Sequence, residues 1–312
     1  MSKIKTMVRL FYDNPERVRT ALADNLSKMS ISRVQSDKFY LKLQYRLIFN
    51  RKLDLKNPQT YNEKLQWLKL YDRRPEYSML VDKYRVKKYV AERIGSEYVI
   101  PTLGVWDGFD EIDFSSLPDR FVLKCTHDSG GLIICRNAAS LDKNAAREKI
   151  ERSLKRDFYK LAREWPYKNV PRKIIAEQYM EDDATEELRD YKFFCFDGVP
   201  KAMFIATDRQ KSGEEVKFDY FDMEYNHLSC RQRHPNAKVP PEKPSCFEEM
   251  KELAAKLSAG IPHVRVDFYE VNGKIYFGEM TFFHFGGMVP FEPEEWDDTF
   301  GSWLKLPTKV ER

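Results

Sequence analysis

Side chains able to do chemistry are concentrated in one stretch of the chain, residues 264–281, with the sequence VRVDFYEVNGKIYFGEMT. β-branched and aromatic residues alternate with other residues on either side of Asn272-Gly273, a strong signal for a tight turn between two strands. The pattern predicts a β-hairpin with strands over 264–270 and 274–280.

Four polar side chains of this hairpin are expected to meet. Arg265 and Asp267 are two residues apart on the first strand and share a face, as do Glu279 and Thr281 near the end of the second. The hairpin can therefore bring Asp267, Glu279 and Thr281 together. Two carboxylates and a neutral oxygen are hard ligands of the kind that Mg²⁺ accepts, with its other positions left to water and nucleotide phosphates. The alternative is a solvated face of an edge hairpin.

Composition and charge restrict the class of protein. The 312 residues are enough for a sizeable core divided among two or three subdomains, and a net charge of +4 gives no argument for nucleic acid binding. The first 60 residues carry 13 Lys and Arg against 5 Asp and Glu. This basic arm suits peripheral contact with anionic lipid or another polyanion, or is a solvated helical face.

Five cysteines are scattered without any CxxC pair, which indicates free thiols in a reducing compartment and argues against a zinc site. No stretch approaches the roughly 20 apolar residues of a membrane span, and the first residues lack the apolar run of a signal peptide. We therefore expect a cytoplasmic protein.

Helical patterns dominate the first part of the chain. Two or three amphipathic helices are predicted within residues 1–56. Thr60 followed by Glu63 forms a capping box and predicts the start of another helix. A further helix is predicted over 81–94, ended by Gly95.

From residue 98 onward, short strands and turns prevail, and the segment 208–245 is expected to be mostly loop with one hairpin. The Gly-containing loop of residues 127–136 connects two strands. Because strands neighbour strands more often than they alternate with helices, the α+β class is predicted. Strands are predicted over 98–101, 105–106, 120–126, 173–180, 190–196 and 200–207, and helices over 141–165 and 246–260.

Several motifs follow one another in a recognisable order: Asp82-Lys83, the stretch 121–131, the stretch 174–181, Asp190-Tyr-Lys192, and the hairpin. On these motifs the chain resembles the ATP-grasp superfamily, and more narrowly the TupA-like ATP-grasp proteins of bacterial surface-polysaccharide biosynthesis. The resemblance implies two α+β subdomains that clasp ATP, with an N-terminal helical extension. The corresponding segments are 1–78 (basic helical region), 79–119 (first part of the ATP-grasp module), 120–183 (central subdomain) and 184–312 (C-terminal subdomain).

The resemblance assigns the nucleotide phosphates to basic residues and a glycine loop. Lys83 and Lys124 match the two phosphate-binding lysines, and Lys192 is placed to touch the phosphates. Phosphate charge must be neutralised, and Gly130 and Gly131 are expected to leave backbone N–H groups free to approach it.

The base and ribose of ATP are assigned to the linker that follows residue 173. Glu177 would face the amino group of adenine, and Gln178 and Met180 would offer backbone groups. Glu181 or Asp183 would accept hydrogen bonds from the ribose hydroxyls.

In the hairpin, the resemblance assigns Asp267 and Glu279 to one or two Mg²⁺ ions. Thr281 stands where the family usually has Asn, and a hydroxyl is a weaker ligand than an amide oxygen. Arg265, together with Lys124, would act on the transferred phosphoryl group. The resemblance assigns His284, Gly286 and Gly287 to the acceptor substrate. Arg209, in the basic part of the segment 208–245, is a further candidate to hold an anionic acceptor, and the alternative for it is a solvated surface.

The activity that the resemblance implies is ATP-dependent carboxylate–amine ligation through an acyl phosphate. The expected substrates are an amino acid and a uronic acid or acidic peptide, carried by a small molecule or a lipid-linked glycan. The alternatives are a glycosyltransferase of polysaccharide synthesis, a phosphotransferase on the same fold, and a binding module without turnover. An Asp-x-Asp element after an apolar strand, typical of metal-dependent glycosyltransferases, is absent from the sequence.

Overall fold

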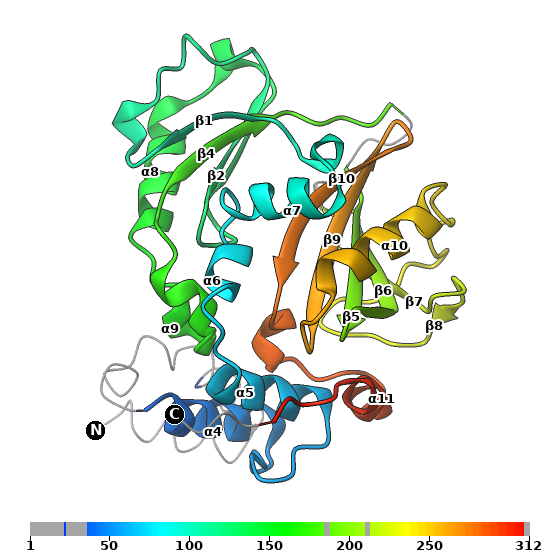
Figure 1. The fold of residues 1–312 in the computed structure, drawn as a ribbon. Helices are drawn as coiled ribbons and strands as arrows, with labels where there is room; N and C mark the ends of the chain where they lie inside the picture. The colour runs from blue at the N-terminus through cyan, green and yellow to red at the C-terminus, as the bar shows by residue number, and fades with distance from the viewer. Residues whose placement is uncertain (1–21, 23–35, 184–187, 210–212, 309–312) are drawn as a thin grey trace.

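Two antiparallel sheets form the centre of the molecule (Figure 1). A computed structural model describes residues 22, 36–183, 188–209 and 213–308. The first sheet has the strand order β1-β4-β2-β3, and the second has the order β10-β9-β5-β6-β7-β8. The strands are β1 Thr102–Trp106, β2 Phe121–Cys125, β3 Leu132–Cys135, β4 Ile174–Gln178, β5 Asp190–Phe196, β6 Val199–Thr207, β7 Lys217–Phe221, β8 His227–Leu228, β9 Val264–Val271 and β10 Lys274–Thr281.

Helices cover the sheets and join them. The first sheet packs on α8, the second packs on α10, and α5 packs on α11. Within the described residues, no helix is long and apolar enough to cross a membrane. The helices are α4 Asp37–Phe49, α5 Tyr61–Tyr71, α6 Tyr77–Leu80, α7 Val86–Ile94, α8 Lys143–Leu154, α9 Tyr159–Ala162, α10 Phe247–Ser258 and α11 Glu295–Trp303.

Each sheet has its own hydrophobic core. Phe121, Leu123 and Ile150 belong to the core between the first sheet and α8. The larger core of the second sheet contains Phe193 and Phe268 and extends to α5, α7, α10 and α11. The two sheets are therefore separate walls, and polar groups can gather between them without breaking either core.

Local sequence signals set several boundaries as predicted. The capping box is present, since the Thr60 side chain accepts from the Glu63 N–H and the Glu63 carboxylate accepts from the Thr60 N–H. Asn272 and Gly273 have φ of 51° and 74°, the left-handed conformation that a tight hairpin turn needs. Both predicted hairpin strands are confirmed to within one residue.

Three predicted boundaries are wrong. The helix predicted over 81–94 begins only at Val86, because the Asp82 carboxylate accepts from the N–H groups of Tyr84 and Arg85 and holds a turn there. The strand predicted over 98–101 is absent, and pairing with β4 starts at Thr102, since Pro101 has no N–H to donate.

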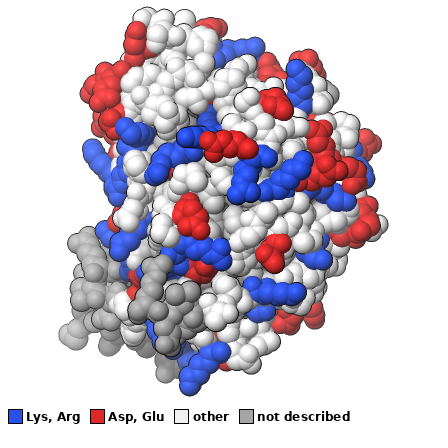
Figure 2. Space-filling model, viewed as in Figure 1, with Lys and Arg blue, Asp and Glu red and all other residues white. Residues whose placement is uncertain are grey.

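The helix predicted over 141–165 is two short helices, α8 and α9, separated by residues 155–158. α9 ends at Ala162, because the next residue, Arg163, has a left-handed φ of 55° that cannot continue a helix. Of the helices predicted within 1–56, α4 is present, and most of the basic arm lies outside the described residues. Figure 2 shows side chains of both signs interspersed over the face in view.

Candidate active site

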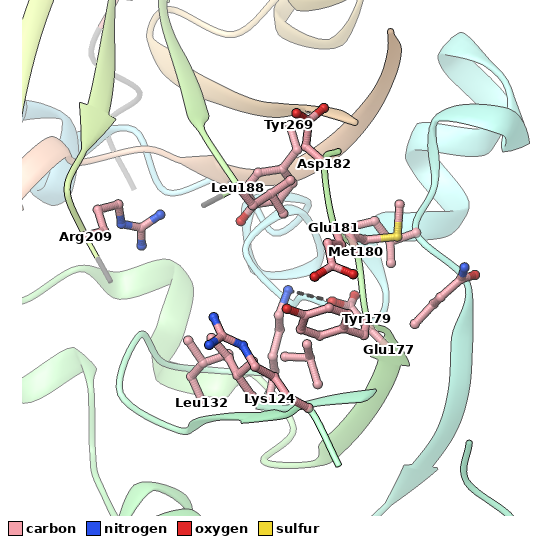
Figure 3. A pocket seen from close by; sticks show the side chains of 15 residues that line it. Lys124, Leu132, Glu177, Tyr179, Met180, Glu181, Asp182, Leu188, Arg209 and Tyr269 are labelled. Atoms are coloured by element: carbon pink, nitrogen blue, oxygen red, sulfur yellow. Dashed lines mark ion pairs between the residues drawn. The ribbon is translucent and has the colours of Figure 1, made fainter. Parts of the chain in front are cut away.

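A pocket of about 320 Å³ opens between the two sheets (Figure 3). Its walls combine apolar side chains with a few charged groups, the usual character of a small-molecule site. The first sheet contributes strands β2, β3 and β4, and the second contributes Tyr269 of β9. The lining residues are Ile100, Val122, Lys124, Leu132, Ile134, Arg136, Glu177, Gln178, Tyr179, Met180, Glu181, Asp182, Leu188, Arg209 and Tyr269.

Glu177 of β4 is the most buried charge of this pocket, with 5% of its surface exposed. Its two carboxylate oxygens pair with Lys124 at 2.5 Å and with Lys87 at 2.6 Å (the Lys124 pair is drawn in Figure 3). Burial alone would raise the pKa of Glu177, but the two lysines outweigh it and lower the pKa. The carboxylate predicted to face adenine is thus already held by two cations.

Lys87 is a site residue that sequence reasoning missed. Its ammonium also donates to the Ile100 carbonyl and the Thr102 hydroxyl, each at 2.8 Å. Lys87 lies four residues after Lys83 within the helix predicted over 81–94, and this spacing was the available signal.

The linker after β4 lines the pocket only in part. Gln178, Met180 and Glu181, which were predicted to lie beside the base and ribose, belong to the lining. Asp183 does not, since it lies in a neighbouring groove, where its N–H donates to the Asn272 side chain at 2.9 Å. The predicted ribose contact of Asp183 is therefore not supported by its position.

Arg209, predicted to bind the acceptor, lies in this same pocket, and it pairs with Asp190 of β5. Asp190 is also 3.4 Å from the ammonium of Lys192, which lies two residues further along β5. Arg209 therefore lines the pocket between the sheets, and through Asp190 it is connected to Lys192.

Beyond the pocket, Glu279 of β10 lies among four cations. Its carboxylate is 3.7 Å from the Lys83 ammonium and 3.3 Å from the Arg265 guanidinium. Burial alone would raise the pKa of Glu279, but the cations outweigh it and lower the pKa from 4.5 to about 2. These cations are Lys83, Lys192, Arg265 and Lys124.

Asp267 of β9 is fully buried and bound by two cations. Arg265 donates to both of its oxygens at 2.7 Å, and Lys192 donates to one of them at 2.5 Å. Arg265 also donates to the Thr281 hydroxyl at 3.0 Å.

This donor set fits Mg²⁺ only in part. The side chain of Glu279 is 37% exposed, so its carboxylate can reach an ion that arrives with a nucleotide. Asp267 would first have to release Lys192 or part of Arg265. The structure brings the predicted ligands together, and among the residues it describes no group of three or more His, Cys, Asp or Glu side chains is placed to hold a metal.

The convergence of Asp267 and Glu279 depends on a β-bulge at Gly278. In a regular hairpin closed at Asn272-Gly273, Glu279 would lie opposite Val266, on the face away from Asp267. The register instead shifts between Phe277 and Glu279, so Glu279 pairs with Asp267. A Cβ at residue 278 would be 3.1 Å from the Asp267 carbonyl oxygen, which explains the glycine.

The glycine loop is held more tightly than expected. The Gly131 N–H donates to the Asp128 carboxylate at 3.1 Å, so it is not free for phosphate as predicted. A Cβ at Gly131 would lie 2.4 Å from the Cys125 sulfur, and close packing is therefore what this glycine permits. Lys83 donates to the Asp128 carbonyl at 2.7 Å and fixes the loop from the other side. Gly130 is exposed.

The turn His284–Gly287 follows β10 directly. His284 is fully buried, and its Nδ1 lies 2.7 Å from the Arg265 guanidinium. Burial, then Arg265 and Lys192, lower the pKa of His284 well below its ordinary value. The neutral ring accepts from Arg265 through Nδ1, so this side chain is held in place by the guanidinium. Gly286 and Gly287 are buried too.

The comparisons with known proteins agree with this geometry. The model of the family described as TupA-like ATPgrasp matches residues 63–305. No curated protein matches the chain.

Several solved structures are similar at low identity. A D-alanine–D-alanine ligase from Bacillus anthracis complexed with ATP is 13% identical, with a TM-score of 0.38; the match covers 65% of this chain and 53% of that one. The D-alanine–D-alanine ligase from Helicobacter pylori is 16% identical, with 79% and 69% covered and a TM-score of 0.38. A RimK domain ATP-grasp protein from Sphaerobacter thermophilus is 12% identical, with 75% and 70% covered and a TM-score of 0.41.

The chain spans about half the length of the Bacillus anthracis ligase. The family match covers both sheets, the pocket between them and the hairpin with Asp267 and Glu279. The predicted α+β fold of the ATP-grasp type is confirmed, and the chain belongs to the TupA-like ATP-grasp family.

Proposed function

We propose that this protein is an ATP-dependent carboxylate–amine ligase that works through an acyl phosphate. One observation carries the proposal: the Lys83 ammonium and the Arg265 guanidinium lie 3.7 and 3.3 Å from the Glu279 carboxylate, beside a pocket of nucleotide size. Phosphoryl transfer needs positioning and charge neutralisation more than a nucleophilic side chain, and this arrangement supplies both.

In the proposed reaction, the base and ribose of ATP occupy the pocket between the sheets and the triphosphate extends towards Lys83, Lys192 and Arg265. A substrate carboxylate attacks the γ-phosphorus, and ADP leaves. An amine then attacks the acyl carbon, so that a C–N bond forms while inorganic phosphate leaves with the electron pair of the broken C–O bond. Arg265 faces the oxygens on which negative charge develops. Mg²⁺ bound with the nucleotide would neutralise further charge, and Glu279 is the residue placed to hold it.

The finer proposal concerns the substrates. We propose an amino acid and a uronic acid or acidic peptide, joined during the synthesis of a capsule, exopolysaccharide or other cell-surface polymer. Two features support this proposal: the TupA-like proteins that the chain resembles belong to surface-polysaccharide biosynthesis, and the first 60 residues form a basic arm. Such an arm suits a polyanionic or lipid-linked glycan acceptor and peripheral membrane contact.

Calorimetry tests the nucleotide site. A Mg-bound non-hydrolysable ATP analogue and a UDP-sugar are titrated into the wild type and into Lys124→Ala, Glu279→Ala and Lys256→Ala. Lys256 is an exposed lysine of α10 and serves as the control. We expect micromolar binding of the ATP analogue that weakens at least tenfold in the first two variants only. Binding of the UDP-sugar without a response to the ATP analogue would overturn the ligase and favour the glycosyltransferase.

A further inference from the structure

Lys69 of α5 is a fully buried lysine outside the pocket, and all three of its N–H groups are used. It donates to the carbonyl of Gly286 at 2.6 Å, to the carbonyl of Ala162 at 2.7 Å and to the side-chain oxygen of Gln66 at 3.0 Å. Burying an ammonium group is costly unless every donor finds an acceptor. The buried ammonium therefore has a role that an apolar side chain could not fill, namely to bind these three acceptors.

The first group that Lys69 holds is the turn His284–Gly287. Phe285, Gly286 and Gly287 have φ of 49°, 62° and 59°, so three consecutive residues are left-handed. Such a backbone persists only where its surroundings fix it. Gln66, one turn before Lys69 on α5, donates to the carbonyls of Gly286 at 3.1 Å and Gly287 at 2.8 Å.

The second group is the end of α9, which follows the helix of the first sheet. Ala162 is its last residue, and the adjacent Leu161 carbonyl accepts from Tyr40 of α4 at 3.0 Å. In Figure 1, α5 lies below both α9 and the end of β10. Lys69 therefore connects the end of α9, which follows α8 along the chain, with the turn that follows β10 of the second sheet.

Glu164 is the charged partner of this junction. It is 8% exposed, and its Oε1 lies 3.4 Å from the position that a Cβ of Gly286 would take. Burial raises the pKa of Glu164 to about 7, while Lys69 and Arg265 oppose that rise. All three N–H groups of Lys69 go to other acceptors, so the interaction of Glu164 with Lys69 is electrostatic and not a hydrogen bond.

We propose that Lys69 is a positioning residue of the reaction centre. It holds the turn that carries His284, and through the 2.7 Å contact of His284 it sets the Arg265 guanidinium relative to α5 and the end of α9. Helix α5 is thereby a part of the active site. The inference rests on the proposed function, because it assigns Arg265 to the transferred phosphoryl group. It predicts that Lys69 affects the chemical step and not the binding of nucleotide.

Lys64 provides a matched control on the same helix. Its ammonium also donates to two backbone carbonyls, those of Gly301 at 2.8 Å and Leu304 at 2.9 Å, at the end of α11. Lys64→Met and Lys69→Met each remove a lysine that binds backbone carbonyls. Only the second touches the turn beside Arg265.

The test uses the full chain with three measurements on the wild type, Lys69→Met and Lys64→Met. The first is the Kd of a Mg-bound non-hydrolysable ATP analogue, and the second is ADP formation from saturating Mg-ATP with water as the acceptor. The third is amide hydrogen exchange of the peptide that covers residues 284–289. In Lys69→Met we expect a Kd within threefold of wild type, ADP formation at least tenfold slower and faster exchange in this peptide. In Lys64→Met all three should match the wild type.

Equal ADP formation and equal exchange in the two variants would overturn the positioning role. Absence of nucleotide binding in the wild type would overturn the proposed function instead, and the exchange measurement would still decide whether Lys69 holds the turn. If Lys69→Met does not fold, Gln66→Leu removes the neighbouring contacts to Gly286 and Gly287 and one of the three acceptors of Lys69, while the contacts of Lys69 to Gly286 and Ala162 remain. The same pattern at smaller amplitude is expected there, and unchanged exchange would refute the inference.

Discussion

Replacing Glu177 by Gln should destabilise the protein through the two lysines that it leaves behind. Glu177 compensates Lys124 and Lys87 at 2.5 and 2.6 Å, and the three groups carry a net charge of one. In Glu177→Gln the two ammonium groups remain close together with no carboxylate between them. The loss is therefore expected to exceed that of an ordinary exposed ion pair.

The magnitude follows from distance and burial. Two unit charges 2.6 Å apart attract by about 6 kcal/mol at an effective dielectric constant of about 20, and most of this offsets desolvation. Removing one partner of a buried pair costs about 3–5 kcal/mol. The side chains of Lys124 and Lys87 keep 20% and 12% of their exposure, so water relieves part of the repulsion. We expect a loss of about 2–4 kcal/mol, or a Tm lower by roughly 3–6 °C.

A double-mutant cycle gives the assay. Urea unfolding is measured for the wild type, Glu177→Gln, Lys87→Met and the double variant. Because Lys87→Met removes one of the two repelling cations, it should be destabilising alone and should recover at least about 1 kcal/mol in the Glu177→Gln background. If Lys87→Met costs the same free energy in both backgrounds, the two residues are not coupled and the reasoning is refuted.

Three further predictions concern the hairpin, the turn and acid. Glu279→Gln should weaken binding of Mg-ATP about tenfold but weaken binding of ATP in EDTA much less, since the lysines and Arg265 around residue 279 are then no longer neutralised by a carboxylate and remain available to the phosphates. Calorimetry with and without Mg²⁺ tests this, and equal losses under the two conditions would contradict it. Gly287→Ala should lower the free energy of unfolding by about 1–3 kcal/mol, because φ is 59° and the new Cβ would meet the Gln66 amide at 2.5 Å; unchanged urea unfolding would count against this. The pKa values of Glu177 and Glu279 are lowered on folding, so the folded state binds fewer protons than the unfolded state. The free energy of unfolding should therefore fall as the pH is lowered from about 4.5 to 2. Urea unfolding at several pH values should show a smaller fall for Glu279→Gln than for the wild type.

Much of the fold followed from local sequence signals. The turn at Asn272-Gly273 and the capping box of Thr60 act over a few residues, so neighbouring sequence is enough to specify them. The family motifs added the order of the pocket residues, and Lys124, Glu177 and Met180 lie in one pocket as that order implied.

What the sequence could not reveal depends on contacts between distant segments. Lys69 has the spacing of a solvated helical lysine, and only the approach of Ala162 and Gly286, 93 and 217 residues further along the chain, makes it a buried junction. His284 was predicted to contact the substrate from its place in the sequence alone. Its burial depends on the packing of the second sheet, which no short motif can specify. The pairing of Glu177 with Lys87 likewise arises from a helix and a strand that only the tertiary fold brings together.

The bulge at Gly278 has a consequence for how this hairpin tolerates change. Ile275 and Phe277, before the bulge, face the core, whereas Glu279 and Thr281, after it, face Arg265. The number of residues between the turn and Glu279 therefore decides whether the Glu279 side chain faces Arg265 or the core, whatever residue types lie between them. An insertion or deletion of one residue here would move the following side chains to the opposite face of the strand without changing its composition much. We conclude that length is the most constrained property of this hairpin, and that conservative substitutions along it are the safer changes.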